Sequence, residues 1–452
     1  MILSVSTIFA QNLSMANKNI LKALGPGILF ASTCIGVSHL VQSTRAGAVY
    51  GFDLIWIILL ANLFKYPFFE YASRYANATG TSIIDGYNRL GKWVLLLYGL
   101  ITIGTMFFVT SAVGVVTSGF MDNLLGISVY FKNKGFEHPE IITPILLFGV
   151  CFGILVSGKY KVLDILIKVV GSILLISTLI AFTKSLIAGG IQPYEGFVPP
   201  DLSDLTTPEG IGHLGFIIAL MGWMPTALDL SAWNSLWTVA RMKQTGYRPK
   251  LKETLFDFNF GYIISALLAI CFVTLGANLL YGSPEELSGS SAGFAAQVVE
   301  MFTSAMGDWS KWIIGIAAFC IMFGTAIAVM DGYARSSERI LEILFLEGKK
   351  QNLDNRKREY VISILILSVV SFVLMYFLYF DPSLESKSGF KSIVDLATST
   401  SFVVAPVIAI LNFILVQKKY IGEGFTPPLW KKVISYFGIL FLTGFSIFYF
   451  VN

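Results

Sequence analysis

Long apolar stretches recur along the whole chain and constrain its fold more than any other feature. Examples are residues 54–71, 93–116, 162–186, 256–280 and 361–379. A helix that crosses a bilayer needs about 20 mostly apolar residues, and these stretches are close to or above that length. Only 13% of the residues are charged, against about 25% in a typical soluble domain. The sequence therefore predicts an all-α integral membrane protein.

Eleven membrane spans are predicted, and the charges of the loops between them predict their direction. The spans cover residues 25–48, 52–75, 93–120, 141–157, 162–188, 211–238, 256–281, 309–333, 359–380, 391–416 and 430–451. If the N-terminus lies inside, the inner segments and span ends hold 24 of the 32 Lys and Arg residues, as the positive-inside rule requires. We expect a multi-pass protein of the cell membrane with a cytoplasmic N-terminus and an external C-terminus.

Spans 1 and 6 are predicted to break near their middle. Span 1 contains the sequence STCIGVSH at residues 32–39, and span 6 contains MGWMPT at residues 221–226. Proline removes a backbone donor and glycine lowers helix propensity. Irregular backbone at membrane depth is tolerated where it is buried in protein or lines a cavity. One alternative is that each motif only bends its helix.

Two broken spans, five spans apart, indicate a transporter built from two inverted repeats. The first repeat covers residues 25–190 and the second covers residues 211–418. Residues 1–24 form an N-terminal cytoplasmic segment, and residues 430–451 form an extra helix. In such proteins the substrate lies between the two breaks.

The predicted substrate site consists of the residues at the two breaks. They are Gly36, Ser38 and His39 in span 1, and Met221, Met224 and Thr226 in span 6. The alternative for His39 is a buried imidazole that is hydrogen-bonded within the helix bundle.

Three charged residues within or at the end of predicted spans are candidates for the pathway or for coupling. Arg45 follows His39 by less than two turns and either faces the pathway or extends to the outer interface. Asp229 shares a helix face with Thr226 and either faces the pathway or is bonded inside the bundle. Asp331 either contacts an inner gate or belongs to a series of charge pairs at helical spacing. For Lys65 and Glu70 of span 2 we expect partners on neighbouring helices.

The first two spans resemble the opening of the Nramp divalent-metal transporters. The resemblance covers GPGILFASTCIGVSHLVQSTRAGAVYGFDLIWIILLAN at residues 25–62 and continues at ATGTS, residues 78–82. Met224-Pro225 stands where the family has Met-Pro-His. The resemblance implies a leucine-transporter-type fold, which is two inverted five-helix repeats (spans 1–5 and 6–10) plus one extra helix.

The metal motifs of the family are altered in this chain. Its Asp-Pro-Gly-Asn falls on Gly36-Val37-Ser38-His39, and the His of Met-Pro-His falls on Thr226. Met224 and His39 are then the only side-chain candidates for a metal, and neither is anionic. Hard divalent ions prefer carboxylate or several oxygen ligands. Transport of manganese-like or iron-like ions by the usual site is therefore not expected.

No enzyme motif occurs in the chain, and neither a cofactor nor a nucleic-acid partner is predicted. The predicted function is secondary-active transport by alternating access. The substrate is either a metal cation that uses a remodelled site, or another small solute such as an amino acid or organic ion. A non-transporting sensor on a transporter scaffold is a further alternative. Apart from its substrate, we expect the protein to interact with the lipid bilayer. We expect it to be a monomer.

Overall fold

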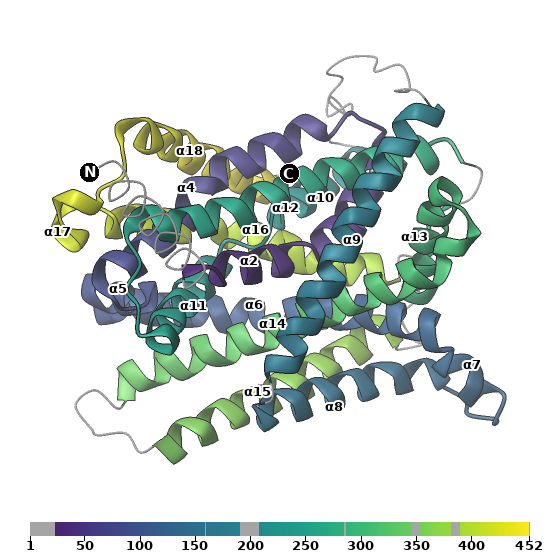
Figure 1. The fold of residues 1–452 in the computed structure, drawn as a ribbon, viewed down its shortest axis with the longest axis horizontal. Coiled ribbons are helices and arrows are strands. Elements are labelled where there is room, and N and C mark those ends of the chain that lie inside the picture. Colours follow the sequence, from purple (N-terminus) through teal and green to yellow (C-terminus); the bar gives the residue numbers. More distant parts are fainter. Residues whose placement is uncertain are drawn as a thin grey trace, which may run out of the picture.

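The regular structure of the described residues consists of helices, most of which gather into one bundle. A computed structural model describes residues 23–158, 160–189, 208–283, 286–345, 353–380 and 389–451. Figure 1 shows most of the long helices running in similar directions, while α9 crosses the view more steeply. Of the predicted N-terminal segment 1–24, residues 1–22 lie outside the described residues.

Each predicted span coincides with a helix or with a broken helix. In chain order these are α2 (Pro26–Cys34), η1 (Ser38–Ser43) and α3 (Thr44–Tyr50) for span 1, α4 (Ile55–Thr79), α6 (Lys92–Leu125), α8 (Ile142–Ser157), α9 (Tyr160–Gly189), α10 (Pro208–Gly222) with α11 (Leu230–Thr245) for span 6, α12 (Leu251–Leu279), α14 (Lys311–Phe345), α15 (Leu353–Met375) with η5 (Tyr376–Phe380), α16 (Phe390–Leu415) and α18 (Leu429–Val451).

Among the residues that the structure describes, seven helical segments are long and apolar enough to cross a membrane by themselves. The other four predicted spans have physical reasons to differ. Spans 1 and 6 are broken into shorter helices, and α4 carries Lys65, Glu70 and Arg74. For span 5, the segment Gly171–Ile187 of α9 is apolar but shorter than a complete crossing. The helices agree with eleven spans, and the number and direction of the crossings stay predictions.

Several shorter helices join the spans, and they were not predicted. They are α5 (Ile83–Leu90), α7 (Ile127–Lys132), η2 (Pro139–Ile141), α13 (Ser291–Met306), η4 (Asp308–Ser310), α17 (Lys418–Ile421) and η6 (Glu423–Phe425). The largest is α13, which begins after Ser290, whose hydroxyl accepts from the Gly293 amide. It buries Phe294, Val298 and Phe302. It has 16 residues, and a membrane span needs about 20. The length criterion that we applied to the sequence therefore did not select it.

Glycines let both halves of span 1 lie directly against α12. A Cβ atom on Gly27 of α2 would lie 1.9 Å from the Asp257 carbonyl oxygen, and one on Gly47 of α3 would lie 2.1 Å from the Val273 carbonyl oxygen. Small residues allow this backbone approach between membrane helices. The Asp257 carboxylate also accepts from the amides of Gly25 and Gly27, at 3.0 and 2.6 Å. These contacts fix the position of the first break.

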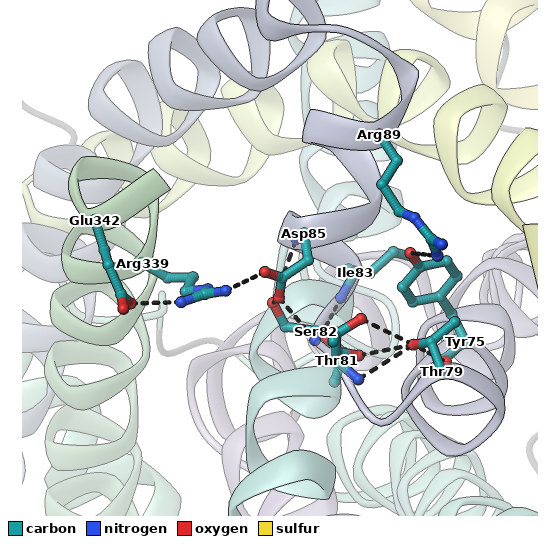
Figure 2. Close-up of polar contacts among 10 residues, drawn as sticks. Tyr75, Thr79, Thr81, Ser82, Ile83, Asp85, Arg89, Arg339 and Glu342 are labelled. Carbon is teal, nitrogen blue, oxygen red and sulfur yellow. Dashed lines mark hydrogen bonds and ion pairs between the residues drawn. The ribbon is translucent and has the colours of Figure 1, made fainter. Parts of the chain in front are cut away.

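At the bundle end predicted to face the cytoplasm, polar contacts join α5 to α14 (Figure 2). The Asp85 carboxylate accepts from the Ser82 amide and hydroxyl, at 2.9 and 2.6 Å, and completes the capping box in which Ser82 is the N-cap of α5. Arg339 of α14 forms an ion pair with Asp85 and bonds Glu342 on its own helix at 2.5 Å. One acid thus completes the capping box of a helix and holds that helix against another span.

Candidate functional site

The predicted break in span 1 is present. Helix α2 ends at Cys34, and a π-helix, η1, begins at Ser38. The Ser38 hydroxyl donates to the Cys34 carbonyl, one of the acceptors at the end of α2. A Cβ atom on Gly36 would lie 2.7 Å from side-chain atoms of Thr325 in α14. Glycine therefore permits α14 to approach the break closely.

Span 6 is interrupted over a longer stretch, from the end of α10 at Gly222 to the start of α11 at Leu230. The Met224-Pro225 peptide bond in this stretch is cis. A Cβ atom on Gly222 would lie 2.0 Å from the Thr398 carbonyl oxygen of α16. The break therefore lies directly against span 10.

The backbone carbonyls at the span 6 break accept hydrogen bonds from the fully buried Lys65 of α4. Its Nζ donates to the carbonyl oxygens of Met221 at 2.6 Å, of Gly222 at 2.8 Å and of Thr226 at 3.3 Å. The expectation that Lys65 has a partner outside its own helix is confirmed. The sequence did not indicate that the partner is the break itself. One signal in the sequence could have suggested this contact. A lysine lies inside one span, and another span carries a break that contains glycine and proline.

His39 is also fully buried, and its ring is bonded on both sides. Nδ1 lies 2.8 Å from the Ser38 hydroxyl, and Nε2 lies 2.8 Å from the Ser265 carbonyl oxygen of α12. The imidazole is therefore held against α12, as in the alternative of a histidine bonded within the bundle. Its role as a substrate ligand stays a prediction.

The two breaks meet through a residue that the sequence analysis did not select. The Ser43 hydroxyl of η1 lies 3.9 Å from the Met224 sulfur. Met221 and Thr226 contact Lys65 through their backbone carbonyls. The six predicted site residues therefore fall into two groups, one at each break.

Asp229 lies just before α11 and is buried inside the bundle. Its Oδ2 accepts from Thr105 at 3.3 Å and from Tyr333 at 3.2 Å. Within the described part of the chain, its Oδ1 accepts no hydrogen bond. Asp229 is therefore bonded inside the bundle, as in the alternative given for it, and its role in the pathway stays a prediction.

A cavity of about 400 Å³ lies beyond the breaks, at the end of the bundle predicted to face outside. We call it the outer cavity. Its lining comes from α3, α10, α16 and α18, and it comprises Arg45, Val49, Tyr50, Gly212, Gly215, Phe216, Asp395, Leu396, Ser399 and Tyr449.

An ion pair joins two walls of the outer cavity. Arg45 bonds Asp395 of α16 through both terminal nitrogens and also donates to Gln42 at 2.9 Å. The guanidinium carbon lies 4.8 Å from the centre of the Phe216 ring. Arg45 therefore faces the cavity. Asp395 was not among the predicted residues, because the sequence around it does not indicate that Arg45 is its partner.

Asp331 is bonded to the neighbouring turn and to the next span. It accepts from Arg335 at 2.7 Å and from Tyr360 at 2.5 Å. These contacts join α14 to α15, and they fit the alternative of helical charge pairs. Its role in an inner gate stays a prediction.

Among the described residues, no group of three or more His, Cys, Asp or Glu side chains could hold a metal ion. The break region offers carbonyls, hydroxyls, two thioethers and one imidazole. With Lys65 on the carbonyls, this donor set does not match what a hard divalent ion prefers.

Comparison with known families identifies the chain. A family model described as "Natural resistance-associated macrophage protein-like" matches residues 27–452. The chain belongs to the Nramp family. A protein of Pasteurella multocida, "Uncharacterized protein PM0681", is 35% identical over 427 residues, which are 94% of this chain and 91% of that protein. "Metal transporter Nramp2" of Oryza sativa is 22% identical and covers 92% of this chain and 75% of its own length.

Solved structures show the same fold. A manganese transporter from Eremococcus coleocola superposes with a TM-score of 0.65 at 13% identity, over 96% of this chain and 87% of that one. MhsT, solved with L-phenylalanine, has a TM-score of 0.61 at 15% identity, over 94% of this chain and 97% of that one. The prediction of an all-helical leucine-transporter-type fold is confirmed. This Nramp protein is a multi-pass membrane transporter and not an enzyme.

Proposed function

We propose that this Nramp protein is a secondary-active transporter that works by alternating access, with its cargo bound between the breaks of spans 1 and 6. The cargo enters through the outer cavity. Arg45 follows His39 by six residues, which is about 9 Å along a helix. The Arg45–Asp395 pair therefore lies between the breaks and the outer end of the bundle. It is suited to close the pathway by joining span 1 to span 10.

The observation that carries this proposal is the outer cavity itself. It is bounded by both broken spans and by span 10, and an ion pair with two hydrogen bonds crosses it. Discontinuous helices beside such a cavity are the arrangement in which inverted-repeat transporters bind cargo. The fully buried His39, Met221 and Met224 below it fit a state in which the cargo site is closed.

We propose a small organic solute, such as an amino acid, as the cargo. The outer cavity, at about 400 Å³, is far larger than one metal ion needs. Its lining combines aromatic rings from Tyr50, Phe216 and Tyr449 with one base and one acid. Aromatic side chains beside a small number of polar groups are found in sites for small organic molecules, and the rings and the ion pair supply both kinds of group here.

A metal cation that uses a remodelled site is the second candidate. It is favoured by the names of relatives, among them "Divalent metal cation transporter MntH" of Listeria monocytogenes, which is 22% identical over 94% of this chain. It is also favoured by the Met224 thioether beside Ser43, since thioethers bind softer metals.

Uptake into proteoliposomes tests the proposal. Purified protein is reconstituted, and counterflow of a labelled amino-acid mixture is compared with uptake of Cd²⁺ and Mn²⁺. We expect saturable amino-acid counterflow that is lost in the Asp395→Asn variant. Saturable metal uptake alone would favour the second candidate. Absence of any flux from correctly folded protein would contradict transport and support a sensor.

Cysteine labelling tests the pathway separately. Ser399 lines the outer cavity, and Thr400 is the next residue of α16 but does not belong to the lining. We expect a membrane-impermeant thiol reagent to label Ser399→Cys and the solute to slow that labelling. Thr400→Cys should give no protection by the solute. Equal protection of both cysteines would contradict entry through this cavity.

A further inference from the structure

We propose that Lys65 is a tethered cation, meaning that its ammonium group occupies the cation position formed by the carbonyls of the span 6 break and keeps metal ions out of it. The inference deepens the proposed function, because it takes the break as part of the cargo site. It makes Lys65 the residue that excludes metal cargo, while the cargo itself binds elsewhere between the breaks.

The geometry around Nζ is that of a bound cation. Three backbone oxygens, from Met221, Gly222 and Thr226, surround it at 2.6 to 3.3 Å. Clusters of backbone carbonyls are what proteins use to replace the water shell of a cation. Two of these carbonyls belong to the last turn of α10, where the helix dipole favours positive charge.

The ammonium group has no donor left for cargo. Lysine carries three N–H donors and no acceptor, and each of the three has a carbonyl partner here. Lys65 therefore acts through the backbone of the break and does not touch a solute. A metal ion that binds the same three carbonyls together would have to take the position of the Lys65 ammonium, and so would have to displace it.

Lys431 shows how different Lys65 is from an ordinary buried lysine. Lys431 of α18 lies 3.1 Å from the Glu70 carboxylate, which is the usual arrangement for a buried base. In the described part of the chain, no carboxylate lies within ion-pair distance of Lys65. Carbonyl oxygens thus make up the whole hydrogen-bonding shell of Lys65.

Chemical rescue provides the test. Lys65→Ala removes three carbons and the ammonium, which is the volume of n-propylammonium. The variant, purified in detergent in choline chloride, should unfold at a lower temperature than the parent. Added n-propylammonium should raise this temperature in proportion to the logarithm of its concentration. The neutral molecule 1-propanol should not, and neither compound should affect the parent.

Metal binding by the same samples gives a second readout. We expect Mn²⁺ to leave the melting temperature of the parent unchanged and to raise that of Lys65→Ala. Lys431→Ala is the matched control. It also loses a buried lysine, but Glu70 keeps its bonds to Arg74, so no cation site should open.

Two results would overturn the inference. One is saturable Mn²⁺ binding by the parent that Lys65→Ala leaves unchanged. The other is a stable Lys65→Ala protein that responds to neither the amine nor Mn²⁺. If Lys65→Ala does not fold, Lys65→Met, which keeps most of the side-chain volume, is tested with Mn²⁺ in its place. Saturable Mn²⁺ binding by the parent would then overturn the inference by itself. Because these are equilibrium measurements in detergent, a failure of transport would leave them unaffected.

Discussion

The Arg45 guanidinium and the Asp395 carboxylate face each other with two parallel hydrogen bonds, 2.7 Å from Nη1 to Oδ1 and 3.0 Å from Nη2 to Oδ2. The residues are 350 positions apart in the chain. This geometry is the strongest form of a carboxylate–arginine interaction. It joins the outer half of span 1 to span 10, and breaking it would separate two walls of the outer cavity.

The first prediction concerns this ion pair. Asp395→Asn should leave the protein folded but abolish solute counterflow, because the charge that holds Arg45 across the cavity is lost. Labelling of Ser399→Cys should become at least several-fold faster, since the cavity stays open. Arg45→Lys keeps the charge without the two-point geometry and should give intermediate labelling. An Asp395→Asn protein with parental flux and labelling would show that the pair has no gating role.

The second prediction concerns manganese. The parent should show the same Mn²⁺ flux as empty liposomes. Gly36→Asp with His39→Asn restores the two ligand types of the family, but Lys65 still holds the carbonyls, and a side chain at position 36 would meet Thr325. We expect this double variant to bind no Mn²⁺.

Addition of Lys65→Ala to the double variant should produce saturable Mn²⁺ binding, measured by isothermal titration calorimetry. The anionic ligand and the free carbonyls are then both available to the ion. Robust Mn²⁺ uptake by the unmodified protein would contradict the prediction, and it would mean that the present residues suffice for metal transport.

Local sequence predicted the helices well because membrane helices depend on local length and polarity. The breaks at Gly36 and at Met224-Pro225 were also predictable, since glycine and proline act on their own helix turns. The contacts between helices could not be predicted from the sequence. The direction of the His39 ring toward Ser265, for example, depends on how span 1 is rotated against α12, which the sequence of span 1 does not contain.

Lys65 and Asp395 show the same limit for charged residues. A charge inside a span signals that a partner exists, but the partner of Lys65 is backbone 156 to 161 residues away. Backbone carbonyls carry no sequence signature, so only the fold reveals this interaction. The Asp395 carboxylate lies near the outer end of span 10, where an acid is not unusual enough to mark a site.

The third prediction tests the crossing of α2 and α12. Gly27→Ala would place Cβ 1.9 Å from the Asp257 carbonyl oxygen, and such overpacking typically costs about 1–3 kcal/mol. Gly104→Ala in α6 is the control, because nothing lies within 4 Å of its Cβ position, and the gain in helix propensity is up to about 1 kcal/mol. In thermal unfolding in detergent, Gly27→Ala should melt earlier than the parent and Gly104→Ala should not. The opposite order would show that α2 is not held by this contact.

The fourth prediction separates the two roles of Asp85 in Figure 2. Arg339→Gln removes the ion pair with Asp85 and the bond to Glu342, and leaves the capping box of α5 intact. The two side chains are 30% and 17% exposed, so we expect a loss at the upper end of the about 0–1 kcal/mol of surface pairs. Asp85→Ala removes the ion pair and also the bonds to the Ser82 amide and hydroxyl. Half of the capping box is then lost, since the Ser82 hydroxyl still accepts from the amide of residue 85. This adds a part of the about 1 kcal/mol of a complete N-cap, so Asp85→Ala should melt at a lower temperature than Arg339→Gln. The double variant should then lose less than the sum of the two single losses, because the ion pair between the two residues is counted only once. The remaining effect of Arg339→Gln is the loss of its bond to Glu342. Additive losses in the double variant would contradict the contact between Arg339 and Asp85, and with it the link between α5 and span 8.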